Sequence, residues 1–156
     1  MGSEMCIRDR LLVGNFEEDL DPLKKEVIDE INLNPNIVYV GYQNDIRPYL
    51  AISNCFVFPT YREGFPNVIL QAGAMNIPCI VSNINGCNEI IKDRINGILI
   101  AKKNIQELIE AMSRISSNHN LRNKLAKNSR QIILKNFDQK SIWESLKNEY
   151  NMLSNV

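Results

Sequence analysis

The sequence predicts an α/β fold: a parallel sheet of about five strands, flanked by helices and followed by a helical C-terminal tail. Short apolar runs alternate with amphipathic segments at a spacing of roughly 20 residues, as in right-handed βαβ units. Beyond about residue 104 the periodicity is helical only. The 156 residues suffice for one domain with a core of its own.

Composition restricts the classes of function. The chain is 44% hydrophobic and has a formal net charge of +0, whereas a nucleic-acid-binding domain normally presents a basic face. No run approaches the ~18 apolar residues of a membrane span. The four cysteines contain no C-x-x-C pair, and Cys55 and Cys79 lie in apolar strand patterns. Buried thiols and a reducing cytosol are therefore expected.

The first ten residues, M-G-S-E-M-C-I-R-D-R, show no clear period and no core face. They are too few and too charged for a secretion signal. We therefore assign residues 1–10 to a leader that does not look native, and residues 11–156 to a single domain.

The first elements are short. An apolar run predicts a buried strand at 11–13, and Asp21 is expected to cap a helix with Pro22 at its first position. A second strand is expected at 37–40, and a short helix over about residues 45–52.

The central elements surround a polar loop. A strand is expected at 55–58, the loop Y-R-E-G-F-P-N occupies 61–67, and a helix over 68–75 is expected to have Asn67 as its N-cap. A second buried strand follows at 78–81.

The remaining elements are one strand and three helices. A turn that Gly86 closes precedes a short helix, and a strand is expected at 98–100. Asn104 and Glu107 form a capping box for the first long helix, and Asp138 is expected to cap the last. The apolar side of that last helix carries Ile142, Trp143, Leu146 and Tyr150.

The loop at 61–67 is the predicted functional centre. It carries a charged pair, a glycine, an aromatic residue and a proline, which is more than a chain reversal needs. Ligands of open α/β sheets bind at the carboxyl ends of the strands. The following helix begins beside the loop, and its first N–H groups and dipole favour a phosphate. Gly64 permits a close approach of ligand to backbone.

Two polar side chains refine this prediction. A carboxylate beside an anion site would repel phosphate, so Glu63 is expected to meet neutral sugar hydroxyls. Gln71, about one turn into the helix, can point back at the ligand. Each also has a structural interpretation, because Glu63 can pair with Arg62 and Gln71 can face solvent. From the residues alone, the chain is an α/β domain that binds a phosphorylated, hydroxyl-rich small molecule.

The phrase E-G-F-P-N-V-I-L-Q-A-G-A-M resembles the retaining glycosyltransferases of family four, which have the GT-B architecture. That family carries a Glu, seven residues and a second Glu. The resemblance covers nearly all of 11–153 and includes L-L-V-G, N-I-V-Y-V-G-Y, I-N-G-C-N-E-I-I and I-N-G-I-L-I. It implies that residues 11–156 are a single nucleotide-sugar-binding domain of a glycosyltransferase, the Rossmann-like, C-terminal, donor-binding half of a GT-B fold.

The resemblance also implies roles for individual residues. The donor sugar would meet Glu63, Gly64, Phe65 and Pro66, the diphosphate would meet Asn67, Val68 and Gly86, the ribose would meet Gln71, and the base would meet Gly41, Tyr42 and Gln43. No complete catalytic set is expected in the chain. No metal site or cofactor is expected either, because no D-x-D pair stands at a loop where it could hold Mg²⁺ beside a diphosphate.

The sequence departs from the family in two ways. Gln71 stands where the family usually has Glu, and its amide can accept from one ribose hydroxyl and donate to the other. The acceptor-holding N-terminal domain and the Arg and Lys that meet the diphosphate are expected to be absent. Weak donor binding and negligible transfer by the chain alone are therefore expected, because such cations often dominate catalysis.

The implied reaction is transfer, with retention, from a nucleoside-diphosphate sugar to a glycan or lipid-linked acceptor, with UDP as the expected nucleotide. The implied setting is bacterial cell-envelope polysaccharide biosynthesis in the cytoplasm, with the full-length enzyme peripheral to the inner face of the membrane. Nucleic acid is not an expected partner. The alternatives are a sugar-nucleotide epimerase and a non-catalytic nucleotide-binding fragment.

Overall fold

The structure is a computed structural model that describes residues 9–16 and 22–154. The described residues fall into two compact units, which divide between Tyr49 and Leu50. The assignment of 11–156 to one domain stays a prediction, as does the leader at 1–10, most of which lies outside the described residues.

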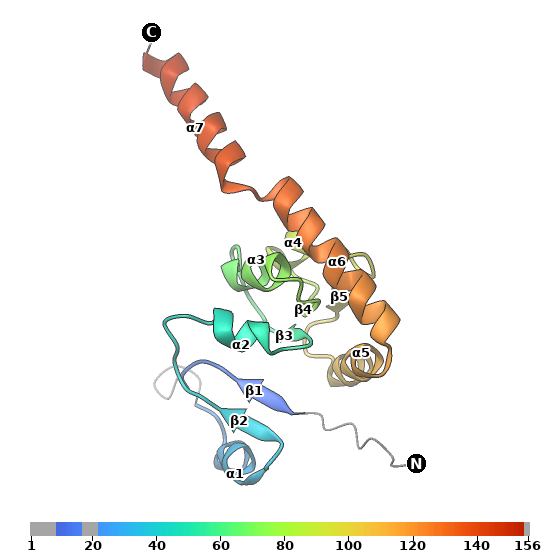
Figure 1. The fold of residues 1–156 in the computed structure, drawn as a ribbon. Coiled ribbons are helices and arrows are strands. Elements are labelled where there is room, and N and C mark those ends of the chain that lie inside the picture. Colours follow the sequence, from blue (N-terminus) through green and yellow to red (C-terminus); the bar gives the residue numbers. More distant parts are fainter. Residues whose placement is uncertain (1–8, 17–21, 155–156) are drawn as a thin grey trace. The chain divides into compact units, whose positions relative to one another are not determined.

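The first unit contains a parallel strand pair and one helix (Figure 1). Strand β1 (Arg10–Leu12) pairs in parallel with β2 (Ile37–Tyr39), and helix α1 (Lys25–Leu33) connects them. The helix packs against β2 and buries Ile31. The two predicted strands are therefore present, each within one residue of its expected bounds.

Helix α1 begins later than the sequence indicated. The residue before it, Lys24, is extended with ψ 146°, and no side chain caps the helix. Pro22 therefore lies outside the helix rather than at its first position, so that part of the prediction is wrong. The predicted capping residue, Asp21, lies outside the described residues.

The second unit contains a three-stranded parallel sheet of order β3-β4-β5. Helix α2 (Arg47–Ala51) precedes it along the chain. The elements that follow are β3 (Phe56–Phe58), α3 (Asn67–Ala74), β4 (Cys79–Ser82), α4 (Cys87–Ile90), β5 (Gly97–Ile100), α5 (Ile105–Ser117), α6 (His119–Asn136) and α7 (Gln139–Ser154).

All five predicted strands are present and parallel, with helices between them, so the expected α/β class is confirmed. Within the described ranges they are hydrogen-bonded as two sheets, of two and three strands, rather than as one. Apolar runs indicate which segments are strands, but backbone hydrogen bonds decide which strands pair, and these leave no sequence pattern.

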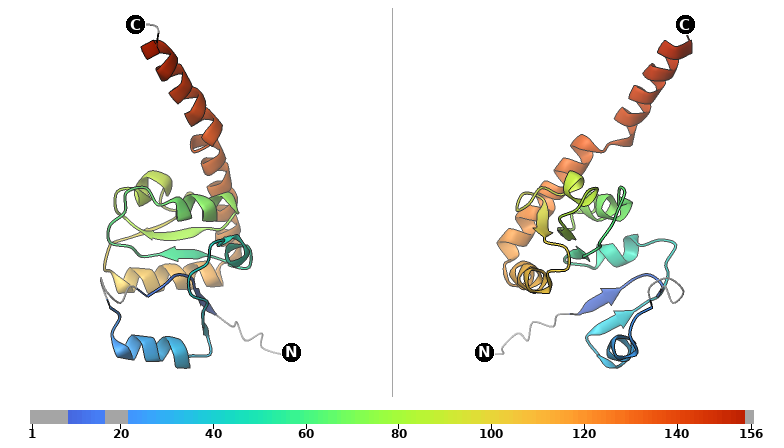
Figure 2. Two further views of the ribbon diagram at one scale, coloured as in Figure 1. Left: turned by 90° about the vertical axis from the view of Figure 1, so that its left-hand side faces the viewer. Right: turned by 180° about the vertical axis from the view of Figure 1, so that it is seen from behind.

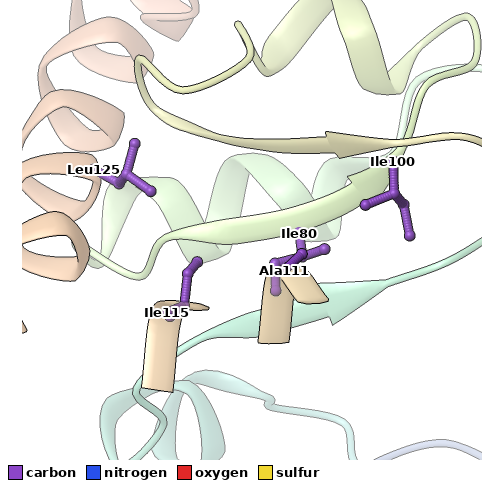
Figure 3. Packing of buried hydrophobic residues seen from close by; sticks show 5 residues of the cluster. All are labelled: Ile80, Ile100, Ala111, Ile115 and Leu125. Atoms are coloured by element: carbon purple, nitrogen blue, oxygen red, sulfur yellow. The ribbon is translucent and has the colours of Figure 1, made fainter. Parts of the chain in front are cut away.

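The sheet of the second unit is covered on both faces (Figure 2). Helices α3 and α4 lie on one face, and α5 lies on the other. The central strand β4 is buried along its whole length. The main cluster of buried side chains joins strands to α5 and α6 (Figure 3) and comprises Ile80, Ile100, Ala111, Ile115 and Leu125.

Helices α3 and α6 approach closely at a glycine. A Cβ at Gly73 would lie 2.7 Å from Ser129 Oγ and 2.9 Å from Ile133 Cγ1. The Ser129 hydroxyl is buried and has no hydrogen-bond partner within the described residues. Nearby, the Arg130 guanidinium donates to the Ala74 carbonyl at the end of α3. The absence of a side chain at 73 therefore sets the spacing of the two helices.

The capping box of α5 is confirmed at its N-cap. Asn104 Oδ1 accepts the Glu107 amide at 3.1 Å, while the Glu107 carboxylate accepts from the Asn104 side chain and from the Ala101 amide. Helix α6 begins in the same way, with Asn118 Oδ1 accepting the Leu121 amide. The predicted apolar side of α7 is solvent-exposed, and Trp143 is 62% exposed.

The thiols give a prediction for stability against pH. Cys55, Cys79 and Cys87 are free, and burial raises all three pKa values, for Cys55 to about 12 and for Cys87 to about 11. Below pH 9 these thiols are protonated in both states. Above it only the unfolded chain loses their protons, so the free energy of unfolding should fall by up to ~1.4 kcal/mol per thiol and pH unit. Urea denaturation at pH 8, 9 and 10 measures this fall. A smaller slope is expected for Cys79→Ala, and an unchanged slope would contradict the assignment.

Candidate functional site

The predicted centre is the loop from β3 to α3, at the carboxyl end of β3. Within it, the Thr60 hydroxyl donates to Glu63 Oε1 at 2.9 Å. The Glu63 side chain is half-buried, and no ion pair with Arg62 is formed. The structural interpretation of Glu63 as a partner of Arg62 is therefore wrong for this conformation.

Two glycines bring the loops after β3 and β4 into direct contact. Gly86 has φ +81°, a conformation that side chains rarely adopt, and a Cβ there would lie 2.3 Å from the Gly64 carbonyl oxygen. It would also lie 3.2 Å from Cδ of Pro66. The loops meet because β3 and β4 are parallel neighbours, which end at the same edge of the sheet. The loop at 61–67 and the turn at Gly86 therefore lie against each other.

The amide of Gly86 is already engaged. It donates to Glu89 Oε1 at 3.3 Å, which is the reciprocal arm of a capping box at the start of α4. Gly86 itself is buried against the Gly64 carbonyl, and its N–H group is not free for a ligand in this conformation. Gly86 can border a diphosphate without donating to it.

The Glu63 carboxylate interacts electrostatically with the start of α4. The pKa of Cys87 is raised to about 11, first by burial and then by the negative charge of Glu63. Cys87 itself is fully buried directly after Gly86. The negative charge of Glu63 therefore acts on the buried thiol at the start of α4.

Helix α3 begins one residue earlier than predicted. Asn67 is its first helical residue, Pro66 is the extended N-cap residue, and no side chain caps the helix. The predicted capping role of Asn67 is therefore wrong. The first amides of a helix lack acceptors inside it. The Ile69 amide donates to the Pro66 carbonyl at 3.1 Å, whereas no hydrogen bond within the described residues engages the amides of Asn67 and Val68, which remain available to an anion.

The other predicted residues of α3 and its loop differ in exposure. Pro66 is buried and Val68 is half-buried, whereas Phe65 is 46% exposed. The Phe65 ring also lies 5.9 Å from the ring of Phe137, at the end of α6. Gln71 is exposed on α3, and no hydrogen bond engages its amide within the described residues, so the amide is free for a ligand.

The predicted base-binding loop belongs to the first unit. The Gly41 carbonyl accepts the Gly14 amide at 2.9 Å, and the Tyr42 amide donates to Asn15 Oδ1 at 3.2 Å. Gln43 Nε2 donates to the Val40 carbonyl at 2.7 Å, whereas the Tyr42 ring is 66% exposed. This loop is ordered by its own unit and presents one aromatic ring to solvent.

Sequence reasoning missed three contributors to the site. The Thr60 hydroxyl donates a hydrogen bond to Glu63, the charge of Glu63 helps to raise the pKa of Cys87, and the Phe137 ring lies against Phe65. Only the first left a usable signal, because a hydroxyl three residues before a polar side chain often closes a turn. Within the described ranges, no group of three or more His, Cys, Asp or Glu side chains is arranged to hold a metal.

Comparison with known sequences identifies the family. A sequence model of the family described as "Glycosyl transferases group 1" matches residues 11–132. The chain belongs to this family. The resemblance predicted from E-G-F-P-N-V-I-L-Q-A-G-A-M is thereby confirmed.

Curated relatives of this group 1 glycosyltransferase chain include two named bacterial glycosyltransferases. It is 30% identical over 146 residues to the capsular polysaccharide biosynthesis glycosyltransferase CapM of Staphylococcus aureus, covering 90% of this chain and 37% of that protein. It is 37% identical over 128 residues to UDP-Gal:alpha-D-GlcNAc-diphosphoundecaprenol alpha-1,3-galactosyltransferase of Escherichia coli, covering 82% and 33%. The chain thus spans about a third of the length of these relatives.

Solved structures of the same architecture also match this glycosyltransferase chain. Anabaena Alr3699/HepE in complex with UDP-glucose matches with a TM-score of 0.80 at 23% identity, covering 95% of this chain and 41% of that one. The C-terminal domain of a group 1 glycosyl transferase (LpcC) from Francisella tularensis matches with a TM-score of 0.65 at 24% identity, covering 73% and 60%. The likeness confirms the fold. None of the helices in the described ranges has both the length and the apolar character of a membrane span.

Proposed function

We propose that this chain binds the donor of a glycosyl transfer, a nucleoside-diphosphate sugar with UDP as its nucleotide. The observation that carries the proposal is the contact of Gly64 with Gly86, which joins two strand ends at the uncapped start of α3. That place combines free amides for a diphosphate with one half-buried carboxylate for hydroxyls.

The proposed contacts are those that the family resemblance implies. The sugar meets Glu63, Gly64, Phe65 and Pro66, the diphosphate meets Asn67, Val68 and Gly86, the ribose meets Gln71, and the base meets Gly41, Tyr42 and Gln43. Support comes from the uncapped amides at the start of α3 and from the unengaged amide of Gln71.

The reaction of the whole protein is proposed to be transfer, with retention, to a glycan or lipid-linked hydroxyl. The Escherichia coli relative named above and a 35% identical relative from Campylobacter jejuni are both named for diphospho-undecaprenol-linked acceptors, which supports this acceptor class. Independence from metal ions stays a prediction. A cytosolic location at the membrane periphery fits the free thiols at Cys55, Cys79 and Cys87.

Glu63→Ala is expected to weaken binding of UDP-glucose by about tenfold and to change binding of UDP by less than about twofold. The reason is that the carboxylate accepts from hydroxyls of the transferred sugar, which UDP lacks. Its negative charge does not stabilise the diphosphate. Titration of the labelled chain with each ligand, followed by ¹H–¹⁵N NMR, measures both affinities up to millimolar ligand.

Glu144→Ala is the matched control, since it also removes one carboxylate but from the exposed helix α7. It should alter neither affinity. Equal loss for UDP and UDP-glucose in Glu63→Ala would refute the sugar-binding role. No binding of either ligand by the unaltered chain would refute the proposed function.

A further inference from the structure

The backbone on both sides of Glu63 is fixed by packing. After it, the Gly64 carbonyl lies against Gly86, where no side chain fits, and Pro66 is buried at the start of α3. Before it, β3 is hydrogen-bonded to β4 as far as Phe58. The loop between these anchors is short, so the place of the Glu63 α-carbon is set by the sheet and by α3.

The Glu63 side chain is not fixed in the same way. A glutamate has three rotatable side-chain bonds, and ordering such a chain costs up to about 2 kcal/mol. The hydrogen bond from Thr60 is the one polar contact made by its carboxylate within the described residues.

We propose that Thr60 is a positioning residue, whose hydroxyl orients the Glu63 carboxylate toward the hydroxyls of the donor sugar. This inference rests on the proposed function. An ionised carboxylate can only accept, so the hydrogen in the contact belongs to Thr60. The bond engages Oε1 and leaves Oε2 to accept from the sugar. A carboxylate ordered before binding loses less entropy when the sugar arrives.

A purely structural role for the bond predicts something different. Hydroxyl-to-carboxylate bonds across three residues also close turns, and loss of such a bond would loosen the whole loop. Sugar and diphosphate contacts would then weaken together, because both lie on that loop. Positioning of one carboxylate predicts a loss confined to ligands that carry the sugar.

Two substitutions at residue 60 separate these roles. Thr60→Val keeps the shape but removes the donor, and Thr60→Ser keeps the donor. Thr60→Val is expected to weaken UDP-glucose binding by about fivefold with UDP binding unchanged, and Thr60→Ser to restore UDP-glucose binding to within about twofold of the unaltered chain. In chains that already carry Glu63→Ala, Thr60→Val should have no further effect. NMR titrations of the full chain with UDP-glucose and UDP supply every value, and melting temperatures report on folding.

Each other outcome decides against the inference in its own way. If Glu63→Ala shows its selective loss while Thr60→Val binds UDP-glucose normally, the positioning role is refuted and the proposed function stands. If Thr60→Val weakens the binding of both ligands equally, the bond only supports the loop and the inference is refuted. The same holds if Thr60→Val weakens binding further in a chain that already carries Glu63→Ala. If the unaltered chain binds neither ligand, the proposed function fails and the positioning role fails with it.

Discussion

Gly86→Ala is expected to lower the free energy of unfolding by about 3 kcal/mol and to abolish detectable UDP-glucose binding. The alanine Cβ would lie 2.3 Å from the Gly64 carbonyl oxygen, and that neighbour is backbone, which cannot rotate away. The left-handed φ of +81° adds strain of its own. Relief requires the loops after β3 and β4 to separate, which would open the proposed donor site. Urea denaturation and NMR titration measure the two effects.

Gly64→Ala provides the control, because it adds the same methyl group to the other side of the contact. A Cβ at Gly64 meets no atom within 4 Å, and its φ is not in the left-handed range. Stability should therefore stay within about 0.5 kcal/mol of the unaltered chain. If a sugar approaches this backbone, its affinity should still fall. Equal stability of the two alanine variants would show that the loops do not meet as described.

Asn96→Ala is expected to lower the free energy of unfolding by about 3 kcal/mol. Asn96 is fully buried in the turn between α4 and β5. Its Oδ1 accepts the Lys92 amide at 2.6 Å, and its Nδ2 donates to the Ile90 carbonyl at 3.0 Å. Alanine would leave two backbone groups unpaired beside a small cavity, and both the desolvation and the lost packing oppose folding.

The comparison for Asn96 is Asn123→Ala, the same change at an exposed position of α6. There alanine should be neutral or stabilising by a few tenths of a kcal/mol, because it has the higher helix propensity. Thermal and urea denaturation of both variants test the difference. A loss below about 1 kcal/mol for Asn96→Ala would mean that the turn does not depend on this side chain.

The class of fold could be predicted from the sequence because buried strands and helices require apolar residues at regular spacing. Apolar runs such as 79–82 marked strands to within one or two residues. The start of α1 was misplaced because a proline marks where a helix is permitted, not where it begins. The separation into two sheets could not be predicted, because pairing depends on backbone groups common to all residues.

Individual residues of the candidate site could be predicted from the sequence, but the contacts between them could not. Glu63 and Gly64 stood out because a turn alone does not need them. The contact of Gly64 with Gly86 joins residues 22 positions apart, and only the parallel pairing of β3 with β4 brings them together. Phe137 gave no clear signal, since an aromatic residue after a helix has many common uses.

The buried Ser129 hydroxyl of α6 packs directly against Gly73 of α3. It occupies the space that a side chain at position 73 would fill, so the sizes of residues 73 and 129 depend on each other. A larger residue at position 73 is therefore compatible with the fold only when the side chains at both 129 and 133 give way. Selection acting on helix α3, which begins at the proposed donor site, is in this way also recorded in α6.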